Sequence, residues 1–237
     1  MSEIYNELKK YSSAKRQKSN EWFFKTGVGQ YGEGDKFMGV SNPDARKVVG
    51  KFAHLGFADI GQALNSPIHE VRAVGVLILV KQYEGASDEK VKQKVLNFYL
   101  KNLKRVNNWD LVDLSASRIL GMAVYKGLAS KNVLDELAVS KNMWYRRVAI
   151  IATMASIKYG VYGPTLRIAK KLLADKEDIM HKAVGWALRE VWKRDAKTCE
   201  EFLIKNYKNL PRTTLRYAIE RMEERKRKGF LKYKGVL

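Results

Sequence analysis

With 237 residues, 46% of them hydrophobic, the chain is long enough to bury a sizeable core, which excludes an intrinsically disordered protein. Its 45 lysine and arginine residues against 25 aspartate and glutamate residues leave a net charge of +20, which favours a polyanionic partner. Nucleic acid is the first candidate, because cations that bind phosphates release condensed counterions. A membrane surface is the second, and a merely basic or ribosome-associated cytosolic protein is the third.

The first predicted element is an amphipathic helix over residues 2–18. It lacks the long apolar stretch and small-residue cleavage site of a signal peptide. The longest apolar run, residues 71–80, is interrupted by Arg72 and is too short to cross a bilayer. We therefore expect a soluble intracellular protein in the cytoplasm, associated with the nucleoid.

A glycine-rich segment follows, and Gly27-Val-Gly29-Gln-Tyr-Gly32 within it matches the dinucleotide-binding fingerprint literally. That fingerprint requires a strand before it and a helix after it inside a βαβ unit, and the sequence predicts neither. We reject nucleotide binding here. The glycines are better interpreted as allowing tight turns between the first helices, close to a phosphate if DNA is the partner.

Helical periodicity dominates the remainder, and no strand pattern is found. Ser41-Asn42-Pro43-Asp44 and Asn65-Ser66-Pro67 each place a capping residue ahead of a proline in the first helical turn. No low-complexity linker is present, so we predict one domain over residues 1–237. The predicted helices span residues 44–55, 68–83, 88–105, 110–126, 130–139, 143–158, 165–174, 178–193, 197–206 and 212–227.

One type of helix recurs, with a charged residue just inside it followed by small and apolar residues. The charged positions are residues 72, 110, 147, 182 and 216, which are 38, 37, 35 and 34 residues apart. A period of this length is typical of HEAT or armadillo repeats, in which each repeat is a helix pair. The predicted fold is an all-α, HEAT-like helical-repeat solenoid, with the recurring helix lining a basic concave face.

The helix that opens at Trp109 is the most informative segment. Trp109 and Asp113 are four residues apart and share one helix face. A carboxylate is unexpected on a surface that binds a polyanion. Attraction to the positive end of the helix dipole accounts for Asp110 better than for Asp113, which lies one turn further in. The alternative is chemical, since a carboxylate stabilises the oxocarbenium-like transition state of glycosidic cleavage.

A second pattern lies in the helix over residues 178–193. Its positions i, i+4, i+7 and i+11 form one polar stripe, while apolar residues occupy the opposite face. The stripe is either a solvated face with an incidental tryptophan or a groove that binds phosphates and offers an aromatic plane to a sugar or base. Its members are Lys182, Trp186, Arg189 and Lys193.

The sequence gives little indication of a metal site or of a reactive thiol. Cys199, the single cysteine, lies in a helix-like context and is interpreted as a buried structural thiol. The three histidines, at positions 54, 69 and 181, share no ligand spacing, so no metal site is expected. The basic C-terminal segment is interpreted as a solvated, nonspecific phosphate binder; its cations are Arg225, Lys226, Arg227, Lys228, Lys232 and Lys234.

Three of these segments together resemble the bacterial AlkD-type alkylpurine DNA glycosylases. They are Asn-Trp109-Asp-Leu-Val-Asp113, Trp144-Tyr-Arg-Arg147-Val-Ala-Ile and Lys182-Ala-Val-Gly-Trp186-Ala-Leu-Arg-Glu190. The resemblance spans most of the chain. It implies excision of cationic N-alkylpurines, such as 3-methyladenine or 7-methylguanine, from double-stranded DNA by a protein without metal or organic cofactor, which we expect to be a monomer.

The resemblance also implies roles for individual residues. Trp109 and Trp186 would cradle the deoxyribose beside the lesion, Asp113 would supply the catalytic carboxylate, and Arg147 would hold a backbone phosphate. With Arg146 next to it and the cations of the polar stripe, Arg147 completes the predicted DNA-binding set. The family does not need to flip the damaged base into a pocket.

One departure from the family pattern lies between residues 22 and 46. The founding-type enzymes carry a different sequence there, with an aromatic residue that contributes to the cleft, for which Tyr31 or Phe24 would have to substitute. Three hypotheses therefore remain: a glycosylase, a DNA-binding repeat protein that recognises damaged or branched DNA without chemistry, and a protein-interaction solenoid. The charge argues against the third, and the pairing of aromatic residues with a carboxylate favours the first over the second.

Overall fold

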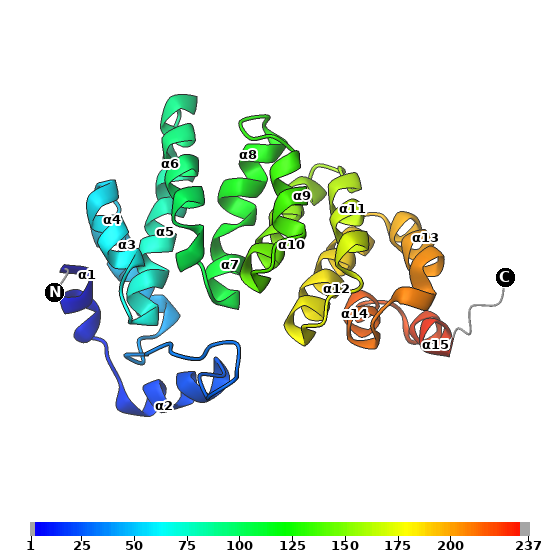
Figure 1. Ribbon diagram of the computed structural model, residues 1–237, viewed down its shortest axis with the longest axis horizontal. Helices are drawn as coiled ribbons and strands as arrows, with labels where there is room; N and C mark the ends of the chain where they lie inside the picture. The colour runs from blue at the N-terminus through cyan, green and yellow to red at the C-terminus, as the bar shows by residue number, and fades with distance from the viewer. Residues whose placement is uncertain (1–2, 233–237) are drawn as a thin grey trace. The chain divides into compact units, whose positions relative to one another are not determined.

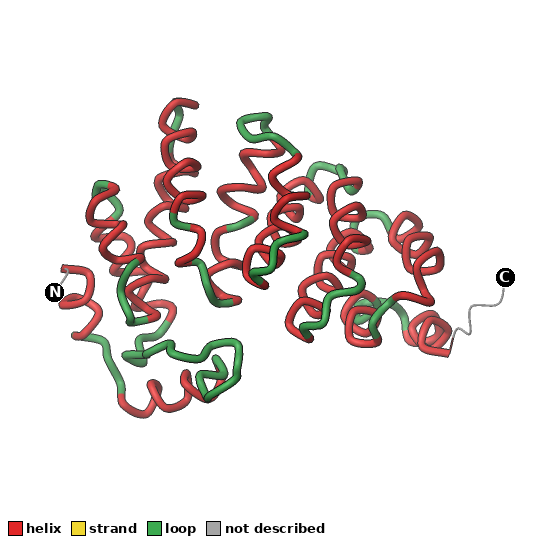
Figure 2. Tube along the Cα trace, viewed as in Figure 1, coloured by secondary structure: helices red, strands yellow, loops and turns green. Residues whose placement is uncertain are grey.

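The structure is a computed structural model that describes residues 3–232. In the described residues the regular structure is helical, and an isolated bridge between Lys36 and Ile68 is the one β pairing there (Figure 2). The predicted all-helical repeat fold is confirmed. The chain divides into two compact units, Met1–Ser115 and Ala116–Leu237. Compactness alone does not decide whether the units fold separately, so one domain stays a prediction.

The first unit contains α1 to α7, with α3, α4 and α6 packed against α5 (Figure 1). A 3₁₀ turn, Leu103–Arg105, separates its last two helices. The helices are α1 (Glu3–Lys9), α2 (Ala14–Phe23), α3 (Asn42–Phe52), α4 (Phe57–Leu64), α5 (His69–Gly85), α6 (Glu89–Lys101) and α7 (Trp109–Ser115).

The second unit begins with a π-helical turn, Ser117–Gly121, and α10 packs against α9, α11 and α12. A 3₁₀ turn, Tyr207–Asn209, follows α13. The helices are α8 (Met122–Tyr125), α9 (Asn132–Ala138), α10 (Met143–Ile157), α11 (Gly163–Leu172), α12 (Asp178–Trp192), α13 (Ala196–Asn206), α14 (Arg212–Ala218) and α15 (Glu224–Lys232).

Each unit has one central helix that is buried around most of its circumference. In α5 every residue from His69 to Val80 is buried, and in α10 every residue from Arg147 to Ile157 except Met154 is buried. A helix that is apolar on all sides needs neighbours on all sides, which the flanking helices supply. The core of each unit is therefore built around the recurring helix rather than beside it.

The recurring helices α5, α7, α10, α12 and α14 begin at residues 69, 109, 143, 178 and 212. These starts are 40, 34, 35 and 34 residues apart, so the repeat inferred from charged positions is a repeat of helices. Each charged position falls within the first five residues of its helix. Trp109, Asp113, Arg146, Arg147 and Lys182 therefore lie near the amino-terminal ends of successive recurring helices. Trp186, Arg189 and Lys193 lie further along α12 or at its end.

Several predicted boundaries are wrong for local reasons. The helix predicted over residues 2–18 is two helices, because Ser13 caps α2 by accepting a hydrogen bond from the Arg16 N–H. Ser41 caps α3 as predicted, whereas α5 begins at His69, two residues beyond Pro67. The predicted helices over residues 110–126 and 212–227 are also interrupted, and α4 is not among the predicted helices.

The interruption before α8 has a packing cause. The Gly121 N–H donates to the Ala116 carbonyl in the i to i−5 pattern of a π turn. A Cβ atom on Gly121 would lie 2.1 Å from the carbonyl oxygen of Ala152 in α10. The glycine therefore allows the two backbones to approach more closely than any other residue permits.

Candidate active site

The amino-terminal turn of α7 carries the predicted pair, Trp109 and Asp113, both partly buried and one helical turn apart. Buried Asn108 precedes the helix, and its Oδ1 accepts a hydrogen bond from the Trp109 N–H at 2.8 Å. The Asp110 Oδ1 accepts one from the Leu111 N–H at 2.8 Å. Local hydrogen bonds therefore hold the turn that presents both side chains.

Aromatic residues at the carboxyl-terminal end of α2 contact Trp109. The Phe24 ring stacks on the Trp109 ring, with centroids 5.2 Å apart and planes 13° apart. Phe23 meets Trp109 edge-on at 5.7 Å, and Phe37 lies 4.8 Å from Phe24 on centroids. Phe24 thus supplies an aromatic neighbour to Trp109, while the Tyr31 hydroxyl donates to the Phe23 carbonyl at 3.5 Å.

His69, at the start of α5, joins the same cluster, with its ring centroid 4.9 Å from that of Phe24 and 4.6 Å from that of Phe37. Its Nε2 lies 2.8 Å from Asp110 Oδ2 and its Nδ1 lies 3.0 Å from Asp35 Oδ2. Burial lowers the pKa of this imidazole, but Asp110 and Asp35 outweigh burial and raise the pKa to about 9. The ring is therefore an imidazolium at neutral pH and donates from both nitrogens.

Asp35 connects three parts of the first unit. Besides His69, its carboxylate accepts hydrogen bonds from Arg72 at 2.6 Å and from the Asn108 amide at 2.8 Å. Burial raises the pKa of this carboxyl, but His69, Arg72 and Asn108 together hold it below its usual value. One side chain of the glycine-rich segment thus binds α5 and the residue that precedes Trp109.

Glu70 fastens the same segment a second time. Its carboxylate accepts backbone N–H groups of Met38, Gly39 and Val40 at 3.0, 2.8 and 3.3 Å. Gly39 has a φ of +74°, and a Cβ atom there would lie 2.2 Å from the Ser13 carbonyl oxygen. The glycines therefore serve tight turns, as predicted, and Gly39 also allows a close approach of two backbones. Within residues 3–26 no strand precedes the nucleotide-like fingerprint.

The His69 contacts predict a loss of stability in alkaline solution. The folded-state pKa of about 9 lies above the unfolded value of 6.5, so the stabilisation is complete below pH 6.5 and is lost as pH rises through 9. The contribution of the charged His69 to the free energy of unfolding is on the order of 1–3 kcal/mol. Urea unfolding between pH 6 and pH 10 measures it, with His69→Gln as reference. Parallel pH curves for the two proteins would contradict the assignment.

In the second unit, α10 carries Arg146 and Arg147. Arg146 makes a two-point contact with Asp175 at 2.6 and 3.1 Å and also donates to the carbonyls of residues 140 and 141. Arg147 is only 5% exposed and donates to the Ile179 carbonyl at 2.9 Å. Arg146 therefore joins α10 to the segment that leads into α12, and Arg147 joins it to the first turn of α12. Their roles in DNA binding stay predictions.

The polar stripe of α12 is an array of ion pairs. Lys182 pairs with Asp178 at 2.8 Å, Lys193 with Glu190 at 2.5 Å, and Arg189 with Glu220. The Trp186 Nε1 donates to Glu190 at 3.2 Å. Exposed pairs of this kind contribute about 0–1 kcal/mol, so a phosphate can replace a carboxylate partner at small cost.

The structure thus brings Trp109 and Asp113 together in one unit, and the two arginines and the stripe in the other. Sequence reasoning missed His69, Asp35 and Phe23. The run Trp22-Phe23-Phe24 is a visible signal, because three aromatic residues beside a glycine-rich loop are unusual on a surface. The contacts of His69 and Asp35 span 34 residues or more, and no local pattern indicates them.

Other predictions concern residues outside this cluster. Cys199 is buried as predicted, and burial raises the pKa of its thiol to about 12. Within residues 3–232 no group of histidine, cysteine and carboxylate side chains could hold a metal ion. The described helices include none with the length and apolar character needed to span a membrane. Of the basic C-terminal residues, those up to Lys232 lie in α15, and Lys234 lies outside the described residues.

Comparison with known proteins identifies the family and supports the fold. The family described as DNA alkylation repair enzyme matches residues 4–222. A solved structure described as a predicted DNA alkylation repair enzyme from Enterococcus faecalis superposes with a TM-score of 0.69 at 15% identity, over 90% of this chain and 97% of that one. No curated protein matches significantly. The match to the family covers nearly the whole chain, which therefore belongs to the DNA alkylation repair enzyme family.

Proposed function

We propose that the protein is a DNA glycosylase that removes cationic N-alkylated purines from double-stranded DNA in base excision repair. The observation that carries the proposal is the turn of α7, where Trp109, held in an aromatic stack, lies one turn from the partly buried carboxylate of Asp113. A binding surface for phosphates alone has no need of a carboxylate there. The family, with its repair enzymes, supports the same reaction.

Excision of a cationic purine requires few catalytic groups from the protein. An alkylated purine already carries a positive charge, so it leaves without a strong general acid. As the glycosidic bond breaks, positive charge develops on the deoxyribose, and the Asp113 carboxylate stabilises it and orients the attacking water. Trp109 would lie against the sugar, and the role of Trp186, on α12, stays a prediction. No metal or organic cofactor takes part in this proposal.

The DNA-binding residues proposed are Arg147, Arg146, Lys182, Arg189 and Lys193. They would contact phosphates on a basic concave face of a HEAT-like solenoid that acts as a monomer on nucleoid DNA in the cytoplasm. Phosphate contacts of this type set affinity rather than sequence preference. The net charge of +20 supports a polyanionic ligand.

Base release from a duplex containing one 7-methylguanine tests the reaction. The purified protein should release the free base faster than spontaneous depurination of the same duplex without protein. Salt-sensitive binding of that duplex with no release would instead support the second candidate, a DNA-binding repeat protein without catalytic activity. The paired cations of α12 fit either candidate, so release and not binding decides between them.

Lys182→Ala should weaken binding of unmodified duplex and flatten the plot of log affinity against log salt concentration by about one unit. The side chain is 45% exposed and pairs with Asp178, and on DNA binding it would exchange that carboxylate for a phosphate. Lys197→Ala is the matched control, because that lysine also pairs with a carboxylate one turn away and is 87% exposed on α13. Equal slopes for the two variants would count against a groove along α12.

A further inference from the structure

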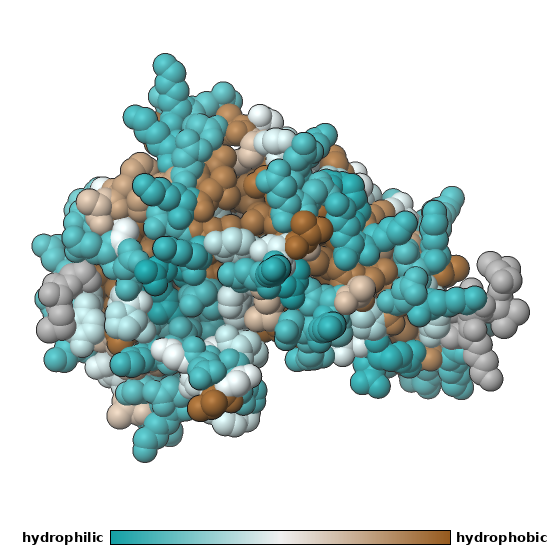
Figure 3. Space-filling model, in the orientation of Figure 1, coloured by the Kyte–Doolittle hydropathy of each residue, from teal (hydrophilic) through white to brown (hydrophobic). Residues whose placement is uncertain are grey.

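The carboxyl-terminal end of α2 exposes large apolar side chains. Trp22 is 73% exposed, Phe23 is 53% exposed, and Val28 in the following loop is 94% exposed. On the visible face a small hydrophobic patch interrupts the hydrophilic surface of this segment (Figure 3). Clustered exposed apolar groups usually mark a binding site, and Trp22 and Val28 lie largely in solvent.

Lys25 closes α2 in an unusual way. The Thr26 N–H donates to the Glu21 carbonyl at 3.2 Å and the Lys25 N–H to the Trp22 carbonyl at 3.3 Å, which together form a Schellman motif. That motif needs a left-handed residue, normally glycine, and here it is Lys25 with a φ of +55°. In the described residues Lys25 is the one non-glycine residue with positive φ.

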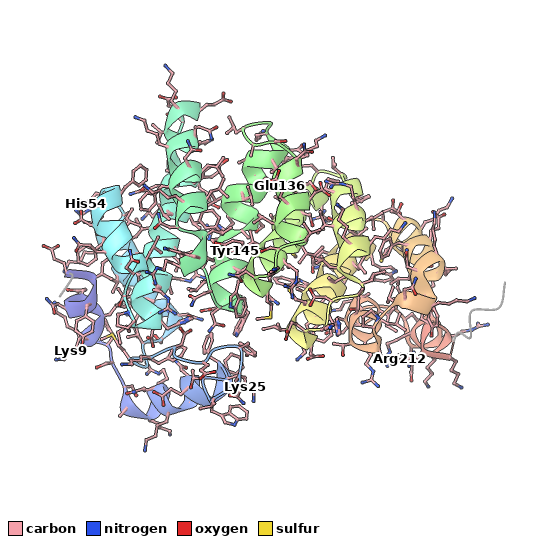
Figure 4. All side chains as sticks on the ribbon, in the orientation of Figure 1. Lys9, Lys25, His54, Glu136, Tyr145 and Arg212 are labelled. Carbon is pink, nitrogen blue, oxygen red and sulfur yellow. The ribbon has the colours of Figure 1, made fainter. Side chains whose placement is uncertain are left out.

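The left-handed backbone of Lys25 is accompanied by a contact between its side chain and Trp22. Its ammonium lies 4.7 Å from the centroid of the Trp22 ring, over one face of the indole, at the position labelled in Figure 4. Strained residues that a glycine could relieve tend to occur at functional positions. The arrangement places a cation beside a largely open aromatic plane.

An aromatic plane with an adjoining cation fits a nucleobase and its phosphate. The charge of α2 also favours a nucleic acid, because the helix carries three basic residues and one acidic residue, Glu21. The basic residues are Lys15, Arg16 and Lys18. The end of α2 is also continuous with the α7 site, because Phe23 contacts Trp109 edge-on at 5.7 Å. A partner that is apolar throughout would leave the ammonium held over the ring without a counter-charge.

We propose that Trp22 and Lys25 form a second nucleic-acid contact, in which an unpaired nucleobase stacks on Trp22 while the Lys25 ammonium binds the adjoining phosphate. The site rests on the proposed function only in taking DNA as its ligand, and it does not need Asp113. It would favour DNA with an unstacked base over a fully paired duplex, whichever base is damaged.

The test compares two labelled duplexes, one fully paired and one with a single-base bulge of 2-aminopurine. Wild-type protein should bind the bulged duplex more tightly and quench its fluorescence. Trp22→Ala should weaken binding of the bulged duplex by about 5- to 150-fold, leave the paired duplex nearly unchanged and abolish quenching, whereas Trp22→Phe should retain part of the preference. Val139→Ser, at an exposed apolar side chain of the second unit, is the control and should behave as wild type.

Lys25→Gly separates binding from structure. Glycine relieves the left-handed backbone, so the variant should unfold at an equal or higher denaturant concentration, yet it should bind the bulged duplex more weakly. Equal losses on both duplexes for Trp22→Ala, or wild-type binding by Lys25→Gly, would overturn the proposal. A lower molecular mass in solution for Trp22→Ala than for the wild-type protein would also overturn the proposal. That result would show that the patch is a contact between copies of the chain.

The two proposals fail separately. Wild-type protein that prefers the bulged duplex but releases no 7-methylguanine would leave this contact supported and the glycosylase proposal refuted. Base release from a paired duplex with no preference for the bulge would do the reverse.

Discussion

Asp113→Asn should reduce the rate of 7-methylguanine release by about 10²- to 10³-fold, as removal of one preorganised group that stabilises transition-state charge does in other enzymes. The substitution keeps the shape of the side chain and removes its negative charge. Binding of undamaged duplex should change little, or become slightly tighter, because a carboxylate repels phosphate. The loss is therefore expected in the chemical step rather than in affinity.

Single-turnover release at saturating protein concentration separates these two effects, and urea unfolding checks that the variant is folded. Asp59→Asn is the matched control, an exposed carboxylate on α4 of the same unit, and should release the base at the wild-type rate. Release by Asp113→Asn at the wild-type rate would remove Asp113 from the mechanism. An equal loss of binding and release would assign it to structure or to binding instead.

Local periodicity made the pairing of Trp109 with Asp113 predictable. Residues four apart on a helix share a face whatever surrounds the helix, so the pair follows once α7 is recognised. The same rule finds the α12 stripe and, through the repeat of charged positions, the recurring helices. Each of these features depends only on residues that are separated in sequence by one helical turn or by one repeat.

The support of the site could not be found that way. Phe24 reaches Trp109 across 85 positions of sequence, and Asp35 reaches Asn108 across 73. The partner of Arg189, Glu220, lies 31 residues away in the turn that follows α14. A single sequence gives the residue types that make such contacts but not their geometry. The cationic character of the stripe can therefore be predicted, whereas its pairing with carboxylates cannot be predicted.

Helix ends were missed for a related reason. Residues 110–126 keep apolar periodicity throughout, yet the helix changes to a π turn where Gly121 meets Ala152. The periodic pattern reports which face is buried, and it is insensitive to a neighbouring backbone that forces one extra residue into a turn. Tertiary contact, and not propensity, decides that boundary.

Asp35→Asn should destabilise the first unit by about 3–5 kcal/mol, the usual cost of removing one charge from a buried ion cluster. The Asp35 side chain is 8% exposed and sits between the His69 imidazolium and the Arg72 guanidinium, at 3.0 and 2.6 Å. Without its charge, two buried cations are left with less compensation. Urea unfolding at pH 7 measures the loss, and Asp44→Asn, at a more exposed ion pair, should cost less.

The same substitution should also slow base release, although Asp35 is not proposed to touch DNA. It holds Asn108, which caps α7, and it anchors the segment that stacks Phe24 on Trp109. A double-mutant cycle with His69→Gln distinguishes a shared network from independent effects, because residues in one network give losses that do not add. Additive losses in stability, with release unchanged in the folded variant, would show that the cluster supports the fold of the first unit and not the position of Trp109.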